Sequence, residues 1–593
     1  MRTNRKTEEK KMSMSKNIAR LAVTAGLTAA LSFGGVMAPV TMAFAEGAAG
    51  STVTFNDPTY QKTTTYKGIQ IFTANVSDSA VTNIQWAGSS QAEKDAIRDV
   101  VVSAIDEAVK AEDSTKSYSS KNAQEAAEWL NEHAETNEAT KVASDNVLNV
   151  IAKKLNTAAF SGAWKATNQD NKSLSGLAAG YWLFLTNSVA EGSNNSSKDV
   201  FTSPVYAVVD GVKDKVVTPK KSVPTVDKKI VNAKGDEELD ASDSHVEQEV
   251  TYNLYGTVAD NYDTYGTYFY KFSDQLSEGL TLKDGFKATL YANKNLAQAD
   301  INHTGGSDVT SHFTQSAETV DPETKNKTTT WTCNDLKQVA DVKPGSCIVI
   351  SYKAKINHEA AIGDNAGNAN SVTLEYSNNP MTTDTGTTVP DEVKTYTYGL
   401  KLNKVDLGTE KALPGATFTI KVKAAADRSL VGKYVQYNGA LKENEQVIPT
   451  DENGTLTVRG LGAGTYTVTE IDAPENYDKV VSFDFTIKSK NESGTTGESS
   501  SADKYELIAP SDQVIIGTPD DKKGDNKLEA KTGTATNDDG TFNITVGDTK
   551  HVGLPLTGLN GVTFTWIAGG AVLCIGVAHL IRSRKQAEES EQE

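Results

Sequence analysis

The sequence predicts a mainly β fold, in which an α+β domain at the N-terminus is followed by tandem β-sandwich domains. Beyond residue 225, nearly all of the chain consists of short segments of alternating apolar and polar residues, separated by turns of Gly, Asn and Asp. This pattern is typical of half-buried strands. Before residue 215, helical stretches are mixed with strands. The length of 593 residues leaves room for three or four domains.

The first 45 residues have the organisation of a secretory signal peptide. A basic region ends at Arg20, an apolar stretch follows from Leu21 to about Met37, and residues 43–45 (Ala-Phe-Ala) form a small-x-small cleavage site. We therefore expect residues 1–45 to be removed and the chain to be secreted.

The segment 46–215 is predicted to be the α+β domain. Ser90 can cap a helix in which Ile97, Val101 and Ile105 recur at helical spacing. Further helical stretches lie around residues 123–130 and 147–155, and the segments GYWLFLT and SPVYAVVD are expected to be strands.

Polar segments divide the remainder of the chain. Residues 216–224 lie in a stretch rich in lysine and proline, without a long apolar run, which indicates a linker. A middle β-sandwich domain is expected over residues 225–385. After a second polar linker, a last β domain is expected over residues 395–550.

Charge and cysteine content narrow the class of protein. A net charge of −18 argues against nucleic acid as a partner. Of the three cysteines, Cys574 lies in an apolar run near the C-terminus, which leaves Cys333 and Cys347. In a secreted chain we expect these two to form a disulfide, with two free thiols as the alternative. No metal site and no cofactor are predicted, because no histidine pair lies near the cysteines. Whether Ca²⁺ or another metal binds the acidic loops stays open, since no regular oxygen-ligand loop is visible.

The C-terminus combines a specific pentapeptide with an apolar run and a charged tail. The pentapeptide is Leu554, Pro555, Leu556, Thr557 and Gly558. Residues 562–581 are mostly apolar and long enough to cross a bilayer as a transmembrane segment. The cytoplasmic tail, residues 582–593, begins with basic residues that would hold this end inside the cell.

This order of features resembles the LPXTG sorting signal of Gram-positive surface proteins, and a plain membrane anchor is the alternative. The resemblance implies that a sortase cysteine attacks the Thr557 carbonyl, releases Gly558 and all that follows, and passes the acyl group to an amine. Pro555 keeps the backbone extended for this attack. The chain would then be the substrate of the transpeptidation.

The accepting amine is suggested by the linker between the first two domains. The sequence Thr218-Pro219-Lys220-Lys221 resembles the pilin motif of sortase-assembled pilus backbone subunits, commonly Tyr-Pro-Lys-Asn. The resemblance implies Lys220 as the acceptor. Because this sequence differs from the motif at both ends, Lys221 stays open as an alternative. On composition alone, a solvated flexible linker is the simpler interpretation.

Strand periodicity places six polar side chains on apolar faces, because residues i, i+2 and i+4 share one face of a strand. They are Lys228, Asp274 and Asn370 in the middle domain, and Lys404, Glu470 and Asp548 in the last domain. For any single residue, the simpler interpretation is that it ends its strand. Burial lowers the pKa of a lysine and raises that of an acid, which gives a nucleophilic amine beside a proton donor.

A second resemblance gives these residues roles. The segments KLNKVD, ALPGATF and TEIDAP resemble a collagen-adhesin B-type (Cna B) domain, an Ig-like β-sandwich, and the middle domain resembles the second domain of pilus backbone subunits. In such domains a first-strand lysine joins an asparagine of the last strand, assisted by an acid. The pairs implied are Lys228 with Asn370, assisted by Asp274, and Lys404 with Asp548, assisted by Glu470. The family usually has Asn at the position of Asp548; the rival position, Gly517, has no side chain to react.

Together these resemblances predict a structural backbone subunit of a covalent surface pilus, anchored to the cell wall. The implied partners are pilus-specific and housekeeping sortases, other copies of the chain and peptidoglycan, with ancillary pilins and host surface ligands left open. A monomeric wall-anchored adhesin is the alternative, since it requires only the sorting signal. A surface enzyme is least favoured, because no HExxH motif, candidate triad or phosphate loop occurs in the sequence.

Overall fold

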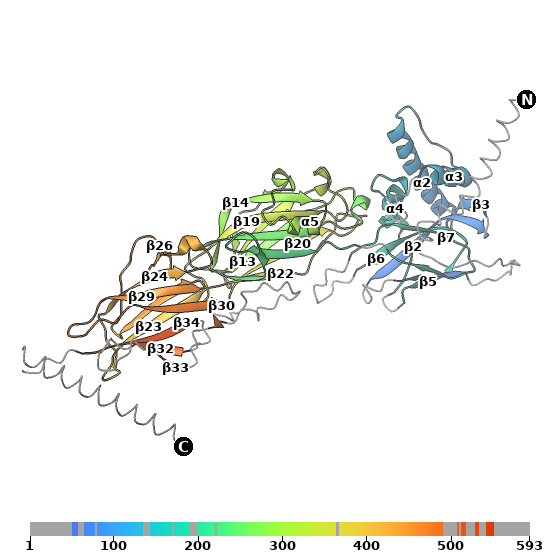
Figure 1. The fold of residues 1–593 in the computed structure, drawn as a ribbon. Coiled ribbons are helices and arrows are strands. Elements are labelled where there is room, and N and C mark those ends of the chain that lie inside the picture. The colour runs from blue at the N-terminus through green and yellow to red at the C-terminus, as the bar shows by residue number, and fades with distance from the viewer. Residues whose placement is uncertain are drawn as a thin grey trace, which may run out of the picture.

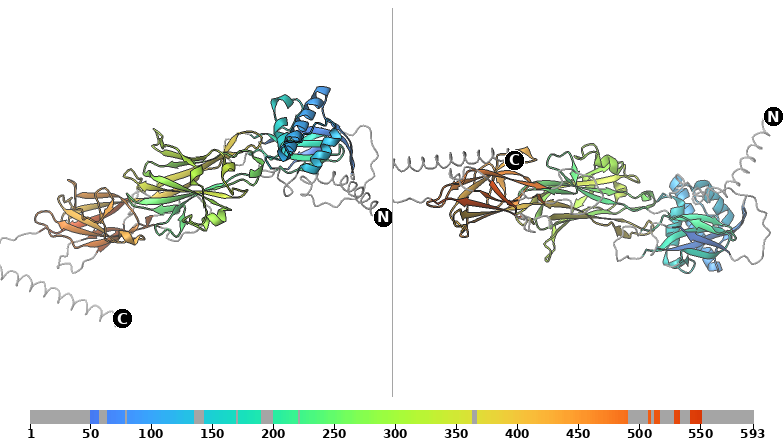
Figure 2. Two further views of the ribbon diagram at one scale, coloured as in Figure 1. Left: turned by 90° about the horizontal axis from the view of Figure 1, so that it is seen from above. Right: turned by 60° about the horizontal axis from the view of Figure 1, so that its bottom comes forward.

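In the computed structural model, three units follow one another in an elongated row (Figure 1), and the two other views show the same arrangement (Figure 2). The residues that the structure describes are 50–56, 64–77, 80–134, 143–168, 171–189, 200–219, 222–362, 367–489, 507–508, 512–516, 528–532 and 541–550. Several predicted features lie outside them: residues 1–45, Lys220 and its neighbour Lys221, the pentapeptide 554–558, the segment 562–581 and the tail 582–593.

The N-terminal unit has three layers, with helices on one face of a sheet of order β3-β2-β6-β7 and a second sheet, β5-β1-β8, on its other face. The strands are β1 (Ser51–Phe55), β2 (Thr65–Val76), β3 (Val81–Trp86), β4 (Lys165–Ala166), β5 (Ser173–Leu177), β6 (Gly180–Ser188), β7 (Val205–Val209) and β8 (Lys215–Val217). The helices are α2 (Gln91–Glu112), α3 (Ala123–His133) and α4 (Val147–Leu155).

Strand β6 shows how the sequence builds these layers. Leu183 and Leu185 pack against the helices, whereas the alternating Trp182 and Phe184 pack against the second sheet. The helix predicted after Ser90 begins there, because the Ser90 side chain accepts a hydrogen bond from the Glu93 backbone N–H.

The middle unit is a β-sandwich of two sheets with the orders β10-β9-β12-β19-β14-β15 and β11-β22-β20-β13-β18-β16. Its elements are β9 (Val226–Val231), β10 (Glu238–Leu239), β11 (Ala241–Asp243), β12 (Glu249–Thr257), β13 (Tyr270–Leu276), β14 (Leu280–Tyr291), α5 (Lys294–Gln298), β15 (Ser307–Asp308), β16 (Thr314–Gln315), β17 (Thr319–Val320), β18 (Lys327–Cys333), β19 (Cys347–Ile356), β20 (Asn368–Ser377), β21 (Thr385–Thr387) and β22 (Asp391–Tyr396). Strands β21 and β22 lie where the sequence suggested a linker, and β22 pairs with β20 along Asn368–Val372.

The C-terminal unit is a second sandwich, with sheet orders β28-β23-β34-β32-β33 and β26-β25-β24-β29-β30-β31. Its strands are β23 (Tyr398–Asp406), β24 (Thr417–Ala424), β25 (Tyr434–Val435), β26 (Leu441–Lys442), β27 (Ile448–Pro449), β28 (Thr455–Leu461), β29 (Gly464–Asp472), β30 (Phe483–Ser489), β31 (Leu507–Ile508), β32 (Asp512–Ile516), β33 (Leu528–Thr532) and β34 (Thr541–Asp548). The first strand, β23, and the last, β34, are parallel neighbours, with Lys404 opposite Val546.

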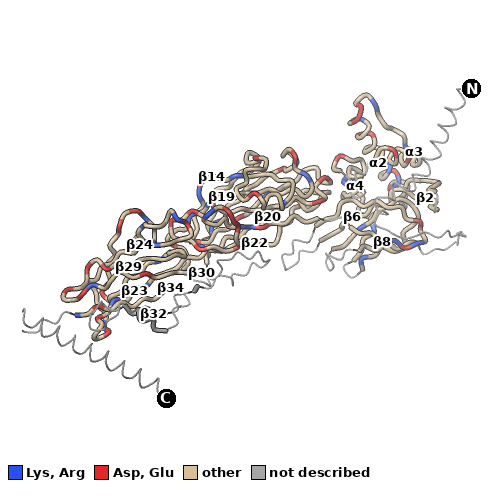
Figure 3. The backbone as a smooth tube through the Cα atoms, viewed as in Figure 1, with Lys and Arg blue, Asp and Glu red and all other residues tan. Residues whose placement is uncertain are grey.

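Direct contacts join the middle and C-terminal units. The Val246 N–H donates to the Gly460 carbonyl at 2.8 Å, and the Ala463 N–H donates to Asp243 Oδ2 at 2.7 Å. Gly460 has φ +83°, and a Cβ there would lie 2.1 Å from Val246 Cγ2, so only glycine fits this contact. Charged residues of both signs are distributed along the backbone of all three units (Figure 3).

The structure confirms the predicted mainly β fold with an α+β N-terminal part. Among the residues described, no helix is both long enough and apolar enough to cross a membrane; the predicted segment 562–581 is not among them.

The predicted disulfide between Cys333 and Cys347 is wrong: both are buried free thiols. Cys333 ends β18 in one sheet and points into the main core of the middle unit. Cys347 begins β19 in the other sheet and packs with Tyr255 and Tyr291, outside that core. A disulfide needs Cα atoms within about 7 Å of each other, whereas facing sheets lie about 10 Å apart. Because Cys333 and Cys347 lie in facing sheets, their thiols are too far apart to form a disulfide.

Both thiols should be protected in the folded protein, because burial raises the pKa of Cys333 and raises that of Cys347 to about 12. We expect the secreted fragment 46–553, treated with iodoacetamide without reductant, to stay unmodified when native and to gain two adducts when denatured. Intact mass measures this. A denatured fragment that gains adducts only after reduction would contradict the assignment.

Candidate functional site

The first candidate site lies between the two sheets of the middle unit. Lys228 comes from β9 in one sheet, whereas Asp274 on β13 and Asn370 on β20 come from neighbouring strands of the other. Alternation along each strand turns all three side chains inward, and their exposed fractions are 0%, 1% and 0%. The structure thus brings together the three residues that the sequence singled out here.

The three side chains are in direct contact. Lys228 Nζ contacts both Asp274 Oδ2 and Asn370 Oδ1. Tyr352 of β19 joins the cluster: its hydroxyl lies 3.3 Å from Lys228 Nζ, donates to Asp274 Oδ1 at 2.8 Å and accepts from Asn370 Nδ2 at 2.7 Å. An amine, a carboxyl and a carboxamide therefore meet in one enclosed site.

Burial sets the protonation behaviour of the cluster. Aromatic rings enclose it, with the Tyr352 ring 5.5 Å from that of Tyr252 and 4.9 Å from that of Trp331. Desolvation lowers the pKa of Lys228 to about 8, although Asp274 opposes the shift, and desolvation raises the pKa of Asp274. Both shifts favour a neutral amine beside a protonated acid.

The sequence reasoning missed two residues of this site, Tyr352 and Asp391. Asp391 Oδ2 accepts the backbone N–H of Lys228 at 2.6 Å and so ties β9 to β22; desolvation raises the pKa of Asp391 to about 6. Tyr352 shares the inward face of β19 with Ile350 and Ala354, at a spacing of two residues, so the strand test applied to the other residues could have found it. For Asp391, the sequence carries no comparable signal.

The second candidate site lies in the core of the C-terminal unit. Lys404 on β23 and Asp548 on β34 come from adjacent strands of one sheet, and Glu470 on β29 comes from the other. Lys404 Nζ contacts Asp548 Oδ1 and lies 2.9 Å from Glu470 Oε1, and the side chains of all three are 0% exposed. The structure again brings together all three predicted residues.

Two carboxyl groups therefore flank one buried amine. Desolvation, opposed by Lys404 and reinforced by Glu470, raises the pKa of Asp548 to about 7. Glu470 Oε2 accepts the Val480 N–H at 2.7 Å, and the Glu470 carboxyl also forms a side-chain hydrogen bond with Asp548. A protonated Asp548 beside Lys404 is thus favoured by the surroundings.

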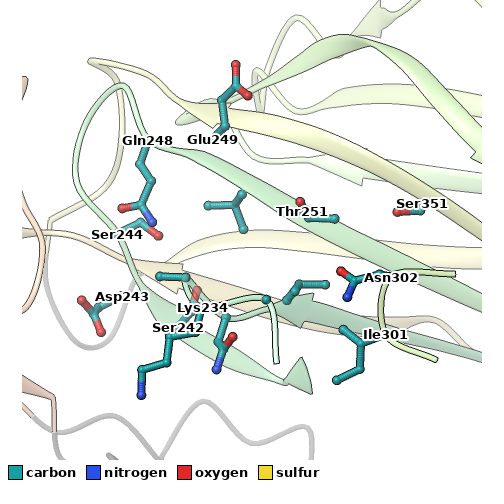
Figure 4. A pocket seen from close by; sticks show the side chains of 15 residues that line it. Lys234, Ser242, Asp243, Ser244, Gln248, Glu249, Thr251, Ile301, Asn302 and Ser351 are labelled. Atoms are coloured by element: carbon teal, nitrogen blue, oxygen red, sulfur yellow. The ribbon is translucent and has the colours of Figure 1, made fainter. Parts of the chain in front are cut away.

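A polar hollow of about 360 Å³ lies elsewhere on the middle unit (Figure 4). Its walls include the hydroxyl and amide side chains of Asn232, Ser242, Gln248, Thr251, Asn302 and Ser351. No member of either buried cluster lines it, so it is a separate feature. Among the described residues, no group of three or more His, Cys, Asp and Glu side chains could hold a metal ion.

One protein-family model matches part of the C-terminal unit. Residues 398–500 match the family model SpaA, a prealbumin-like fold domain. This unit is therefore similar to the domains of that family, and the match includes Lys404 and Glu470 but not Asp548. A search of curated proteins gives no match.

Three of the solved structures that are similar to this chain are pilins. The T6 backbone pilin of Streptococcus pyogenes has 15% identity and a TM-score of 0.47, over 85% of this chain and 98% of that one. The major pilin SpaD of Corynebacterium diphtheriae has 14% identity and a TM-score of 0.41, over 86% and 100%. The major pilin RrgB of Streptococcus pneumoniae has 15% identity and a TM-score of 0.37, over 66% and 86%.

Removing the amine of the second site should destabilise the C-terminal unit in a pH-dependent way. In Lys404→Met, two buried carboxyl groups lose the amine between them, which costs about 3–5 kcal/mol, and the loss of a covalent bond from Lys404 to Asp548 would add to this. The folded-state pKa of Asp548, about 7 even beside Lys404, lies above its unfolded value of about 4. The free energy of unfolding therefore falls as pH rises from about 4 through 7. Calorimetry of the fragment 46–553 should show a larger loss at pH 8 than at pH 5.

The matched control is Lys401→Met, on the same strand but on its other face and partly exposed. We expect little change at either pH. Equal losses at both pH values in Lys404→Met, or an equal loss in the control, would contradict the buried cluster.

Proposed function

We propose that this chain is the structural backbone subunit of a covalently polymerised surface pilus, with an intramolecular isopeptide bond in each β-sandwich. The observation that carries the proposal is the pair of buried clusters: in two successive sandwiches, a fully buried lysine contacts an acyl side chain and an acid. The match of residues 398–500 to the SpaA prealbumin-like domain supports the same class.

The chemistry follows from these contacts. In the middle unit the neutral Lys228 amine attacks Cγ of Asn370, Asp274 handles the protons, and ammonia leaves. In the C-terminal unit Lys404 attacks Cγ of protonated Asp548, Glu470 assists, and water leaves. Each acid acts once, on its own chain, so the protein has no turnover and is not an enzyme in the ordinary sense.

The proposed bonds would resist mechanical tension along the row of units. Strands β23 and β34 are parallel neighbours. Tension applied to the N-terminal end of β23 and to the C-terminal end of β34 therefore shears the hydrogen bonds between them. A covalent bond between Lys404 and Asp548 carries the pull directly. In the middle unit, the bond closes a loop of 142 residues between Lys228 and Asn370, which stabilises by about 5 kcal/mol on the loop-entropy model.

Polymerisation would use a lysine of the predicted linker and the C-terminal pentapeptide. We propose that a sortase joins Thr557 of one subunit to Lys220 of the next, and that the last subunit is passed to peptidoglycan. Support comes from the position of Lys220 between residues 219 and 222, in the connection from the N-terminal unit to the middle unit. The C-terminal pentapeptide of each subunit would then be linked to the connection between the first two units of the next subunit.

Mass spectrometry of the intact fragment can detect both bonds. We expect the fragment 46–553 to be lighter than its sequence mass by about 35 Da, from one ammonia of about 17 Da and one water of about 18 Da. Measured against the sequence mass of each variant, the deficit should shrink by about 17 Da in Asp274→Ala and by about 18 Da in Glu470→Ala, because each change removes the acid of one site. The control Asp284→Ala, exposed on β14, should keep the full deficit. An unshifted wild-type mass would reject both bonds.

Polymerisation can be tested in the cell wall. Immunoblots of wall extracts should show a ladder of high mass for the wild type, collapse to monomer for Lys220→Ala, and an unchanged ladder for the neighbouring Lys221→Ala. The reverse pattern would move the linkage to Lys221. A single monomer band in the wild type would instead indicate a monomeric wall-anchored adhesin.

A further inference from the structure

Tyr352 occupies a central place in the first site. Its hydroxyl contacts all three members of the cluster: Lys228 Nζ at 3.3 Å, Asp274 Oδ1 at 2.8 Å and Asn370 Nδ2 at 2.7 Å. The residue is 3% exposed, and the surrounding rings of Tyr252 and Trp331 hold its own ring in place. The hydroxyl is therefore fixed at the point where protons must move.

Amide formation from asparagine has a specific difficulty: the nitrogen that leaves is strongly basic and must gain a proton as its bond to carbon breaks. Asp274 contacts the attacking amine through Oδ2, and its other oxygen, Oδ1, contacts Tyr352. The departing atom, Asn370 Nδ2, contacts the same hydroxyl. The Tyr352 oxygen thus links the acid to the leaving group.

We propose that Tyr352 is a catalytic residue of the first site, which relays a proton from Asp274 to the departing nitrogen of Asn370. This inference rests on the isopeptide bond of the proposed function. It adds a residue and a direction of proton transfer to that reaction.

The transfers balance in one cycle. Lys228 Nζ forms a bond to Asn370 Cγ and gives one proton to Asp274 Oδ2. Once Nζ has added to Cγ, the amide conjugation is lost and Nδ2 carries a free lone pair. The two hydrogen bonds of Tyr352 then reverse, so that the proton on Asp274 Oδ1 passes to the Tyr352 oxygen and Tyr352 gives its own hydrogen to Nδ2. The Cγ–Nδ2 bond breaks with its electron pair on nitrogen, and ammonia leaves. Asp274 and Tyr352 end in the protonation states in which they began.

The second site shows why the relay is specific to the first. There Glu470 contacts the lysine amine directly and also interacts with the Asp548 carboxyl, whose pKa it helps to raise. The group that leaves Asp548 is a hydroxyl, which is far less basic than an amide nitrogen. This site can therefore work without an intervening tyrosine.

The test is the mass of Tyr352→Phe in the fragment 46–553, followed from purification onward. We expect the water lost at the second site to remain, about 18 Da, and the ammonia, about 17 Da, to be lost at least about 10²-fold more slowly than in the wild type. The control Tyr270→Phe removes another fully buried hydroxyl of the same core, which donates to the Thr257 carbonyl. It should show the full deficit of about 35 Da at once.

A second variant separates chemistry from folding. In Asn370→Asp the leaving group becomes a hydroxyl, so adding Tyr352→Phe to it should slow the loss of water much less than it slows the loss of ammonia from Asn370. A bond in the double variant also establishes that the middle unit folds without the hydroxyl.

The outcomes are distinct. Ammonia loss in Tyr352→Phe at the wild-type rate overturns the relay and leaves the proposed function intact. The relay is also overturned if Tyr352→Phe slows the loss of ammonia from Asn370 and the loss of water in the Asn370→Asp background by the same factor. A hydroxyl with a purely structural role would slow both reactions equally. A wild type that never loses ammonia removes the proposed bond and the relay with it.

Discussion

The burial of a lysine amine in an apolar core governs both sandwiches of this molecule. A charged amine removed from water costs several kcal/mol unless it is paired or neutralised. Lys228 and Lys404 are both 0% exposed, and each meets an acid and an acyl group there. Conversion of the amine to an amide removes the charge permanently, and with it the cost of burial. The same cores that make a free lysine unfavourable therefore favour the cross-link.

The two sites reach this arrangement by different routes. In the middle unit the reacting side chains come from opposite sheets, so the bond would cross-link the two sheets covalently. In the C-terminal unit they lie on parallel neighbouring strands of one sheet, so the bond would reinforce a ladder that tension shears. Hydrogen bonds from Val246 and to Asp243 join the middle unit directly to the C-terminal unit. A long, narrow molecule with protected cores suits a part that carries tension along its length.

Much of this could be predicted from the sequence, because strand alternation is a local signal. Period-two patterning identifies the six side chains of the two clusters without knowledge of their partners. It fails for Cys333 and Cys347, since pairing them requires knowing that their strands lie in opposite sheets and that Cys347 faces away from the main core. Asp391 was missed because its role is to bind a backbone N–H of a distant strand. Tyr352 was missed because an aromatic residue on an inward face already has a sufficient reason to be there.

The most direct test of the two cross-links is a tryptic peptide map of the fragment 46–553. Trypsin cleaves after free lysines but not after a lysine whose amine is an amide. We predict two branched peptides, one joining Lys228 to Asn370 and one joining Lys404 to Asp548, each identified by its fragment ions. Linear peptides that end at Lys228 and Lys404 would show free amines and contradict both bonds.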